Sequence, residues 1–511
     1  MPGYRRTRRP GRTGPAAAPK RGTGRDTDRD TGADSARDDT ARRDTARRSS
    51  LPRRTAYDVL AAVAHREAYA NLLLPRLIAE RGLAGRDAAL ATELAYGTLR
   101  GQGTYDAVLA ACSDRPLDKL DPPVLLVLRL GAHQLLNTRV GGYAAVATSV
   151  DLAKAVAGTR VSGYVNAVLR RVSTRDLDAW LDLLDRPGKT DADSRLALRY
   201  SHPAWIVAAY RDALGDAADE ELEAALAAGN ARPRVTLAAF PGGRPREELM
   251  PPGAEPGRWS PYAFTLSSGD PAGLAASGEA AVQDEGSQLA AIALARAPVA
   301  PRSGGQAPES WLDMCAGPGG KSRLLAGLAS SADARLTAAE IHPHRAALVE
   351  QNLARASGSV AVPPRYQVVV ADGLRPPWRS WPGGGFDRVL VDVPCSGLGA
   401  LRRRPEARWR KSAADIPALA DLQRALLRSA LGAVRPGGVV GYVTCSPVRA
   451  ETRDVVADVV RDADGIEVLD APAVLSRVPA LRSPDPLFAQ LWPHRHGTDA
   501  IFIALLRAPD S

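Results

Sequence analysis

Short apolar runs of the strand type alternate with helical stretches over the C-terminal part of this chain. The expected strands are Trp311–Met314, Arg335–Glu340, Tyr366–Ala371, Asp387–Asp392, Val439–Thr444, Ile466–Leu469 and Ala500–Leu506. Helical patterns lie between most of them, at Gly320–Ala329, Pro343–Ser357, Asp421–Val434 and Glu451–Arg461. This alternation predicts an α/β fold with a mainly parallel sheet covered by helices on both faces. Ligands of such folds bind at the carboxyl ends of the strands.

The first of these strands runs into a glycine-rich turn, CAGPGGK at Cys315–Lys321, which opens a helix. Glycine lets the backbone approach a ligand closely, and a helix N-terminus favours negative charge. A phosphate-binding P-loop would need a glycine where Cys315 stands, so that interpretation is disfavoured. A nucleoside-binding loop instead requires an acid at the end of the next strand, and Glu340 is placed there.

Acidic residues close three successive strands, namely Glu340, Asp372 and Asp392. Any one of these carboxyl groups could serve only as a helix cap. Because the carboxyl ends of parallel strands meet at one edge of a sheet, we expect the three to converge with the glycine-rich turn on one ligand site.

Two cysteines follow two of the strands. Cys395 lies in DVPCSG and Cys445 in TCSP, so both are expected at the same rim as the glycine-rich turn. A buried cysteine is usually inert, but two thiols in loops at strand ends indicate reactivity. A thiolate that adds to carbon 6 of cytosine makes carbon 5 able to attack a sulfonium methyl group. Asp392 is placed to stabilise protonation at N3 of such a ring, while the residues alone leave open which thiol attacks.

The N-terminal half of the chain has a different pattern. Residues 56–175 hold several helically spaced stretches separated by Gly, Pro or Asp, which predicts a compact helical bundle. Residues 176–296 contain further helical patches, a Pro/Gly-rich stretch at Pro241–Gly257 and a smaller mixed region, so we expect a linker and a small subdomain there. Residues 297–511 then form the strand–helix domain.

The positive charge is concentrated at the start of the chain. The 511 residues carry a formal net charge of +10, and most of it comes from the arginine-rich residues 1–55. This stretch has few large apolar side chains, so we expect a disordered basic tail. Such a tail either attaches loosely to polyanions or only keeps the protein in solution.

Other features of the sequence exclude whole classes of protein. No run approaches the roughly 18 apolar residues of a membrane span, and no apolar segment follows the basic N-terminus, so neither a membrane protein nor a secreted one is expected. The cysteines never form a C-x-x-C pair, which favours a reducing cytoplasm. The pairs His342/His344 and His494/His496 lack further ligands, so no metal is expected.

The motifs around the two thiols resemble those of one enzyme family. CAGPGGK, DVPCSG with the following RRRPEARW (Arg402–Trp409), and TCSP are similar to the motifs of S-adenosylmethionine-dependent RNA cytosine-5 methyltransferases. Five further segments resemble the RsmB (Sun-type) 16S rRNA methyltransferases: ELAYGTLR (93–100), YVNAVLRR (164–171), YSHPAW (200–205), QDEGSQLAA (283–291) and HGTDAIFIA (496–504). The resemblance covers roughly residues 51–508. The sequence departs from the family's pattern at two positions. Gly317 stands where alanine is common in the family, and Arg404 stands where histidine is common.

This resemblance implies a fold, a reaction and a site. The fold is an all-α bundle similar to the antitermination factor NusB, a small α/β linker region, and a Rossmann-like α/β methyltransferase domain with a seven-stranded, mainly parallel sheet. Cys445 is implied as the nucleophile and Cys395 as the thiol that helps release the product. The implied S-adenosylmethionine site comprises Cys315, Ala316, Gly317, Pro318, Gly319, Gly320, Lys321, Glu340, Asp372 and Asp392. We expect a cytoplasmic monomer that binds 16S rRNA and needs no metal.

Two other functions remain open at this point. A tRNA cytosine-5 methyltransferase would share the thiol motifs but usually lacks the helical N-terminal domain. A non-catalytic, NusB-like RNA-binding or antitermination protein would have no need of both thiols and three acids. Five arginines beside Trp409 either grip phosphate while the indole stacks on a base, or form a solvated charged helix: Arg402, Arg403, Arg404, Arg408 and Arg410.

Overall fold

The computed structural model describes residues 50–66, 68–185, 191–267, 271–302, 307–380 and 385–510. It divides into two units, Met1–Leu51 and Pro52–Ser511, and the fold below is that of the second. A disordered tail was predicted for residues 1–55. Residues 1–49 of it lie outside the described residues. At residues 52–55 the prediction is wrong, because these residues are part of a helix that the structure describes over residues 50–66. Thr55 and Ala56 are fully buried, which explains why this turn is ordered.

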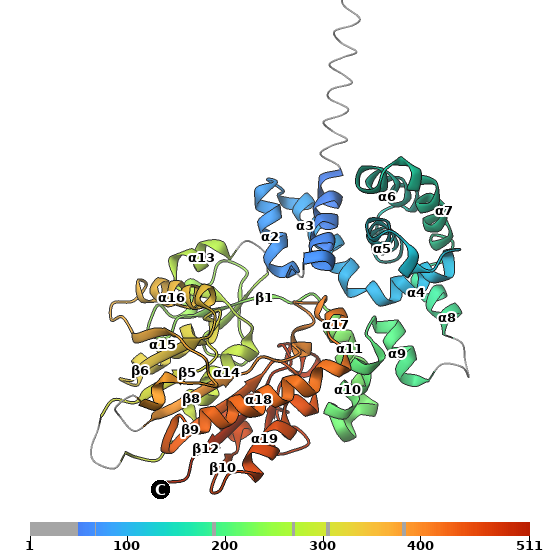
Figure 1. The fold of residues 1–511 in the computed structure, drawn as a ribbon. Coiled ribbons are helices and arrows are strands. Elements are labelled where there is room, and N and C mark those ends of the chain that lie inside the picture. Colours follow the sequence, from blue (N-terminus) through green and yellow to red (C-terminus); the bar gives the residue numbers. More distant parts are fainter. Residues whose placement is uncertain are drawn as a thin grey trace, which may run out of the picture. The chain divides into compact units, whose positions relative to one another are not determined.

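The next part of the chain is helical, as predicted. It comprises α2 (Ala70–Glu80), α3 (Gly85–Arg100), α4 (Gln102–Cys112), α5 (Pro122–Asn137), α6 (Gly142–Ala157), α7 (Ser162–Val172) and α8 (Leu177–Leu184). Helix α5 packs against α3, α4, α6 and α7 (Figure 1). Its side chains Val127, Leu128 and Leu130 are completely buried. Apolar residues at helical spacing thus form the centre of this bundle.

A small mixed region follows. Helices α9 (Ala192–Tyr200), α10 (Ala204–Leu214) and α11 (Ala218–Asn230) lead into an antiparallel sheet of order β2-β3-β1-β4. Its strands are β1 (Val235–Ala239), β2 (Glu255–Pro256), β3 (Ala263–Leu266) and β4 (Ala280–Val282). The short helices α12 (Arg246–Leu249) and α13 (Ala272–Ser277) lie between strands, and α14 (Glu285–Arg296) leads to the large sheet.

The large sheet contains all seven predicted strands. They are β5 (Ser310–Asp313), β6 (Arg335–Glu340), β7 (Arg365–Val370), β8 (Phe386–Asp392), β9 (Val434–Thr444), β10 (Glu467–Leu469) and β12 (Phe502–Arg507). In the described part of the chain their order is β10-β12-β9-β8-β5-β6-β7, and the short β11 (Ala489–Gln490) pairs only with β12. Neighbours from β7 to β9 are parallel, whereas β12 is antiparallel to both β9 and β10. The predicted mainly parallel, Rossmann-like sheet is confirmed.

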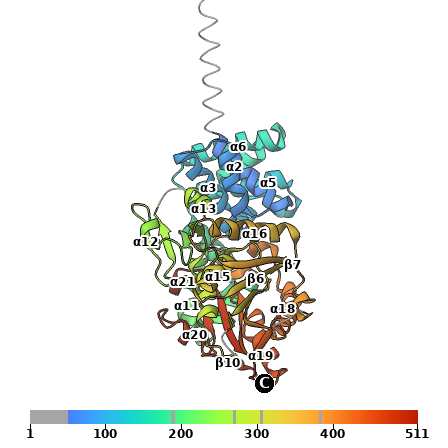
Figure 2. The same cartoon turned by 90° about the vertical axis from the view of Figure 1, so that its left-hand side faces the viewer.

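Helices cover both faces of this sheet because its strands are apolar on both sides. Along β8, Leu390 points to a core shared with α14, α15 (Gly320–Ser331) and α16 (Pro343–Ser357). Its neighbours Val389 and Val391 point to the opposite core, shared with α18 (Ile416–Leu431) and α19 (Arg453–Arg461). Figure 2 shows α16 beside β6 and β7. This two-sided packing fixes the strand ends that carry the predicted site.

Candidate active site at the strand ends

The thiols of Cys395 and Cys445 face each other, with their Sγ atoms 3.3 Å apart. Cys445 directly follows β9, and Cys395 lies three residues after β8. The two strands are parallel neighbours, with Asp392 opposite Val443, so their loops leave the sheet side by side. The backbone N–H of Gly399 also donates to the carbonyl of Cys445 at 2.9 Å. Both thiols are partly exposed.

Hydrogen bonding and charge make these thiols unequal. The pKa of Cys445 is lowered, chiefly because its sulfur accepts a hydrogen bond from Cys395. The positive charges of Lys321 and Arg404 lower it further, while burial and the charge of Asp392 act in the opposite direction. The pKa of Cys395 is raised well above its usual value because it donates to Cys445 and because it is buried. Of the two thiols, Cys445 has the lowered pKa and Cys395 the raised one.

Lys321 and Asp392 form an ion pair beside the thiols. The lysine Nζ lies 2.6 Å from Oδ2 of the aspartate, and their side chains are only 14% and 27% exposed. Burial by itself would lower the pKa of Lys321, but the charge and hydrogen bond of Asp392, together with the charges of Cys445 and Asp313, outweigh it and raise that pKa. The lysine is thus a fixed positive charge next to the pair of thiols.

The glycine-rich turn packs tightly against the end of β6. The N–H of Gly317 donates to Oε2 of Glu340 at 3.1 Å, and Nη2 of Arg345 donates to the carbonyl of Gly317 at 2.7 Å. A Cβ atom on Gly317 would lie 2.1 Å from that Oε2. Gly319 has a φ of +107°, which L side chains rarely adopt, and a Cβ there would lie 3.0 Å from the Cα of Val349.

The remaining residues of the turn serve its shape. The N–H of Ala316 donates to the carbonyl of Ala339 in β6, and the carbonyl of Pro318 accepts from Asn352 at 2.8 Å. Gly320 is the first residue of α15. The pKa of Cys315 is raised by burial and by neighbouring carboxylates, so this third thiol stays protonated.

Asp313 is a site residue that the sequence reasoning missed. It ends β5 and is 1% exposed, and its Oδ2 accepts a hydrogen bond from Ser322 at 2.7 Å. Its Oδ1 is buried and has no hydrogen-bond partner among the described residues. Burial, followed by the charge of Asp392, raises the pKa of Asp313 to about 7. The sequence did contain a sign of this residue, namely an acid near the end of the first apolar strand. It was missed because Asp313 lies inside the expected strand Trp311–Met314 and was counted as part of it.

Asp372 lies two residues beyond β7. Its Oδ1 accepts a hydrogen bond from the N–H of Leu374 at 2.9 Å, which shapes the turn after the strand. The structure therefore brings Lys321 into contact with Asp392, and Gly317 into contact with Glu340. For Asp372 the structure shows only the hydrogen bond from Leu374 within its own turn.

The arginine run after Cys395 is folded into the protein, so both sequence interpretations are wrong for most of it. Arg408 is completely buried, and its Nη1 donates to the carbonyls of Arg100 and Ser201 and to Oδ1 of Asn230. Nη2 of Arg410 donates to the carbonyls of residues 63 and 68. These arginines join the segment after Cys395 to the N-terminal helices.

The first two arginines of the run are paired with acids. Arg402 contacts Asp499 at 3.1 Å, and Arg403 contacts Asp284 at 2.7 Å. Arg404 alone among the five is exposed, and its guanidinium lies 5.1 Å from the centroid of the Tyr69 ring. Arg404 is thus the most accessible arginine of this run, while Arg403 and Arg410 are only partly exposed.

His494 and His496 make structural contacts. His494 lies 2.6 Å from Oε2 of Glu221, and Nδ1 of His496 accepts from the N–H of Trp492 at 2.9 Å. Within the described residues, no group of three or more potential metal ligands occurs. No helix in that part of the chain is long and apolar enough to cross a membrane.

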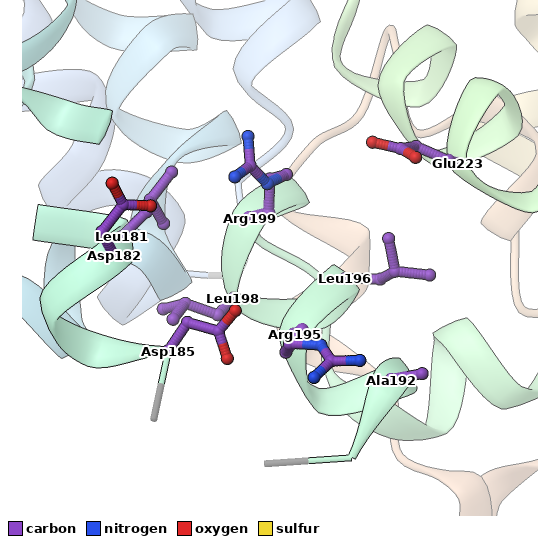
Figure 3. A pocket seen from close by; sticks show the side chains of 9 residues that line it. All are labelled: Leu181, Asp182, Asp185, Ala192, Arg195, Leu196, Leu198, Arg199 and Glu223. Carbon is purple, nitrogen blue, oxygen red and sulfur yellow. The ribbon is translucent and has the colours of Figure 1, made fainter. Parts of the chain in front are cut away.

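A hollow between α8 and α9 lies apart from these residues in the sequence. Its lining, shown in Figure 3, is Leu181, Asp182, Asp185, Ala192, Arg195, Leu196, Leu198, Arg199 and Glu223. None of these belongs to the glycine-rich turn or to a strand end. Residues 186–190, between the two helices, are outside the described part of the chain.

The strand order, the glycine-rich turn after β5 and the acid after β6 together define a methyltransferase domain of the Rossmann-like class. Residues 303–507 match the family model of the 16S rRNA methyltransferases RsmB/F, and residues 50–174 match that of the NusB family. The chain belongs to the RsmB type of S-adenosylmethionine-dependent rRNA methyltransferases.

Individual proteins are similar over nearly the same span. Ribosomal RNA small subunit methyltransferase B of Pseudomonas putida is 32% identical over 468 residues, which cover 89% of this chain and 98% of the relative. Rv1407 of Mycobacterium tuberculosis, named as a candidate methyltransferase without a stated substrate, is 50% identical over 458 residues, or 89% and 96% of the two chains. The crystal structure of PH0851 shares the fold, with a TM-score of 0.72 and 21% identity over 90% of this chain and 98% of that one.

Proposed function

We propose that this protein methylates carbon 5 of a cytosine in 16S rRNA, through a covalent bond between Cys445 and carbon 6 of the base. The observation that carries the proposal is the 3.3 Å contact between the Cys395 and Cys445 sulfurs beside the glycine-rich turn. Methylation of an amino group or a ribose has no use for such a pair of thiols. The name of the Pseudomonas putida relative supports small-subunit rRNA as the substrate. We expect the reaction in the cytoplasm, where such RNA is made.

The rim of the sheet has the groups that a bound S-adenosylmethionine requires. The Glu340 carboxylate can accept hydrogen bonds from ribose hydroxyls, because a carboxylate has about four lone-pair sites and only part of them is used here. At Gly317 and Gly319 a Cβ would collide with Glu340 and with Val349, so these glycines let the turn lie close against the end of β6 and against α16. Within the described part of the chain, Oδ1 of Asp313 is a buried acceptor without a hydrogen-bond partner. When bound, S-adenosylmethionine supplies an electrophilic methyl group to carbon 5.

The residues of this chain then perform the other steps. The thiolate of Cys445 adds to carbon 6, and the electron pair of the 5,6 double bond moves into the ring toward N3. Asp392 is at the strand end from which a carboxylate can stabilise a proton at N3. After methylation, a solvent water takes the proton from carbon 5, and the electron pair of that C–H bond restores the double bond and expels Cys445 as a thiolate. Cys395 assists this release because its S–H donates to the departing sulfur.

The target cytosine must be unpaired or flipped out of a helix to reach the thiols. In this proposal the helical region, residues 56–175, binds RNA, residues 176–296 link it to the enzyme, and residues 297–511 carry out the methyl transfer. The protein acts as a monomer and uses no metal.

Bisulfite mapping of ribosomal RNA tests this function. We expect one protected cytosine in 16S rRNA from cells that contain the protein, and its loss when the gene is removed. Wild-type protein should restore the mark in isolated small subunits, and a Cys445→Ala variant should not. If the lost mark lies in tRNA, or if no cytosine changes, the proposal is wrong.

A further inference from the structure

A buried carboxylate lies beneath both thiol loops. Glu451 is completely buried, and its Oε1 accepts hydrogen bonds from the N–H of Ser396 at 2.7 Å and from Nε2 of Gln423 at 3.1 Å. Its Oε2 accepts from the hydroxyls of Ser396 at 2.5 Å and Ser446 at 2.6 Å. Ser396 follows Cys395 and Ser446 follows Cys445, so one side chain holds the residue next to each thiol.

Further contacts join the same groups. The two serine hydroxyl oxygens are 3.1 Å apart, and Nε2 of Gln423 also donates to the carbonyl of Pro394 at 2.9 Å. The main-chain carbonyl of Glu451 accepts from the Tyr442 hydroxyl at 2.7 Å. The loops after β8 and β9 are thus tied to each other through Glu451 as well as through the sulfurs.

No cation contacts the Glu451 carboxylate among the described residues; four neutral donors satisfy it. Burying a charge without a paired cation is costly, even where donors compensate for lost water. A neutral glutamine could make most of these bonds, since serine hydroxyls can reverse their direction. The carboxylate therefore contributes two things. Its hydrogen bonds hold the loops, and its negative charge acts on Cys395.

We propose that Glu451 is a positioning residue that holds the two thiols in contact and keeps Cys395 as the hydrogen-bond donor and Cys445 as the thiolate. It touches neither substrate nor the reacting atoms, and acts through Ser396 and Ser446. The proposal rests on the proposed function only in so far as Cys445 is the attacking thiol. The charge of Glu451 contributes to the raised pKa of Cys395, after the hydrogen bond to Cys445, burial and the charge of Cys445. Lys321, Arg404 and Asp392 act on the other thiol.

Alkylation of the free protein tests this directly. Wild-type protein is treated with iodoacetamide at pH 7.5, and peptide mass spectrometry gives the labelling rates of Cys445 and Cys395. Because one pKa unit changes the thiolate population about tenfold near neutral pH, we expect Cys445 to react at least about tenfold faster. Glu451→Gln keeps the hydrogen-bonding shape and removes the charge, so that the ratio should fall. Glu451→Ala also releases both serines, and the ratio should approach one.

Asp387→Asn is the matched control. Asp387 is also a fully buried carboxylate, but it lies near the start of β8, where it binds Arg302 and Arg435. Its variant should lose stability and keep the wild-type labelling ratio. The proposal is overturned if Glu451→Gln keeps the wild-type ratio, or if Asp387→Asn lowers the ratio equally. If Glu451→Ala does not fold, the glutamine variant decides.

The labelling requires no RNA, so it is separable from the proposed function. Should Cys445→Ala retain methyl transfer, the proposed nucleophile fails while the labelling ratio still reports on Glu451. With RNA and methyl donor, Glu451→Gln should lower kcat and leave KM for RNA unchanged, since the side chain is buried. A rise in KM alone would contradict a positioning role.

Discussion

The Lys321 ammonium lies 2.6 Å from the Asp392 carboxylate, and the charge of this lysine reaches the thiol of Cys445. The glycine-rich turn before α15 therefore also influences the thiols electrostatically, through the charge of Lys321. In the proposed reaction its glycines let the turn approach the methyl donor closely, while its last residue stabilises the thiolate. This arrangement links the two halves of the site.

A Lys321→Met variant should shift the pH dependence of methyl transfer. The lysine lowers the pKa of Cys445, so its removal raises that pKa and reduces the thiolate fraction at neutral pH. We expect activity at pH 7 to fall about tenfold or more and to recover partly at pH 9, since one pKa unit changes the thiolate population tenfold. Lys119→Met is the control, because Lys119 is exposed and lies in the helical region. If the variant's activity falls equally at all pH values, without a shift of the pH profile, the result contradicts this role.

The two thiols should fail in different ways when each is replaced. Cys445→Ala should abolish methyl transfer and form no covalent complex, because no sulfur is left to add to carbon 6. Cys395→Ala should accumulate a protein–RNA adduct, since the departing Cys445 sulfur loses its hydrogen-bond donor. Denaturing gels with labelled RNA and methyl donor check both outcomes. An adduct in the Cys445 variant, or none in the Cys395 variant, would reverse or remove these assignments.

The sequence predicted best those elements that local patterns determine. The helix Pro343–Ser357 has the predicted bounds, because a proline begins it and glycine follows it. Strand β9 was expected from Val439 but begins at Val434, because Pro436, Gly437 and Gly438 look like a turn and yet continue along β8 with a register shift. The pairing of β8 with β9 is a tertiary contact, and the local sequence around Pro436 does not predict it.

The same distinction applies to the site. Glycines, acids and thiols at strand ends were found from their positions after apolar runs. Glu451 was expected only as the first residue of a helix, and it lies in the turn before α19 with its carboxylate buried under two loops. Arg408 looked like a surface charge and is completely buried. In both cases charge alone predicts exposure, and the donors or acceptors that permit burial come from distant segments.

Replacing Arg408 should destabilise the fold much more than replacing a neighbouring exposed arginine. Arg408→Ala removes a fully buried side chain and leaves two carbonyls and the Asn230 amide oxygen without this donor. Lost packing and unsatisfied acceptors predict a decrease of about 3 kcal/mol in the free energy of unfolding. Arg404→Ala, at an exposed position, should change it by less than about 0.5 kcal/mol. Urea titrations of the three proteins check this, and equal losses in both variants would refute it.

Two glycines of the turn should respond differently to alanine. At Gly319 the backbone has a φ of +107°, and the new Cβ would meet the Cα of Val349 at 3.0 Å, which cannot move without the helix. Gly319→Ala should therefore cost about 1–2 kcal/mol of stability and weaken binding of S-adenosylmethionine.

At Gly317 the three atoms nearest to the new Cβ are at the ends of the flexible side chains of Glu340 and Arg345. These can turn aside, so Gly317→Ala should leave stability almost unchanged and should alter binding of the methyl donor by moving the Glu340 carboxylate. Thermal unfolding with and without S-adenosylmethionine separates the two effects. If both variants lose stability equally, the strain at Gly319 is not what limits this turn.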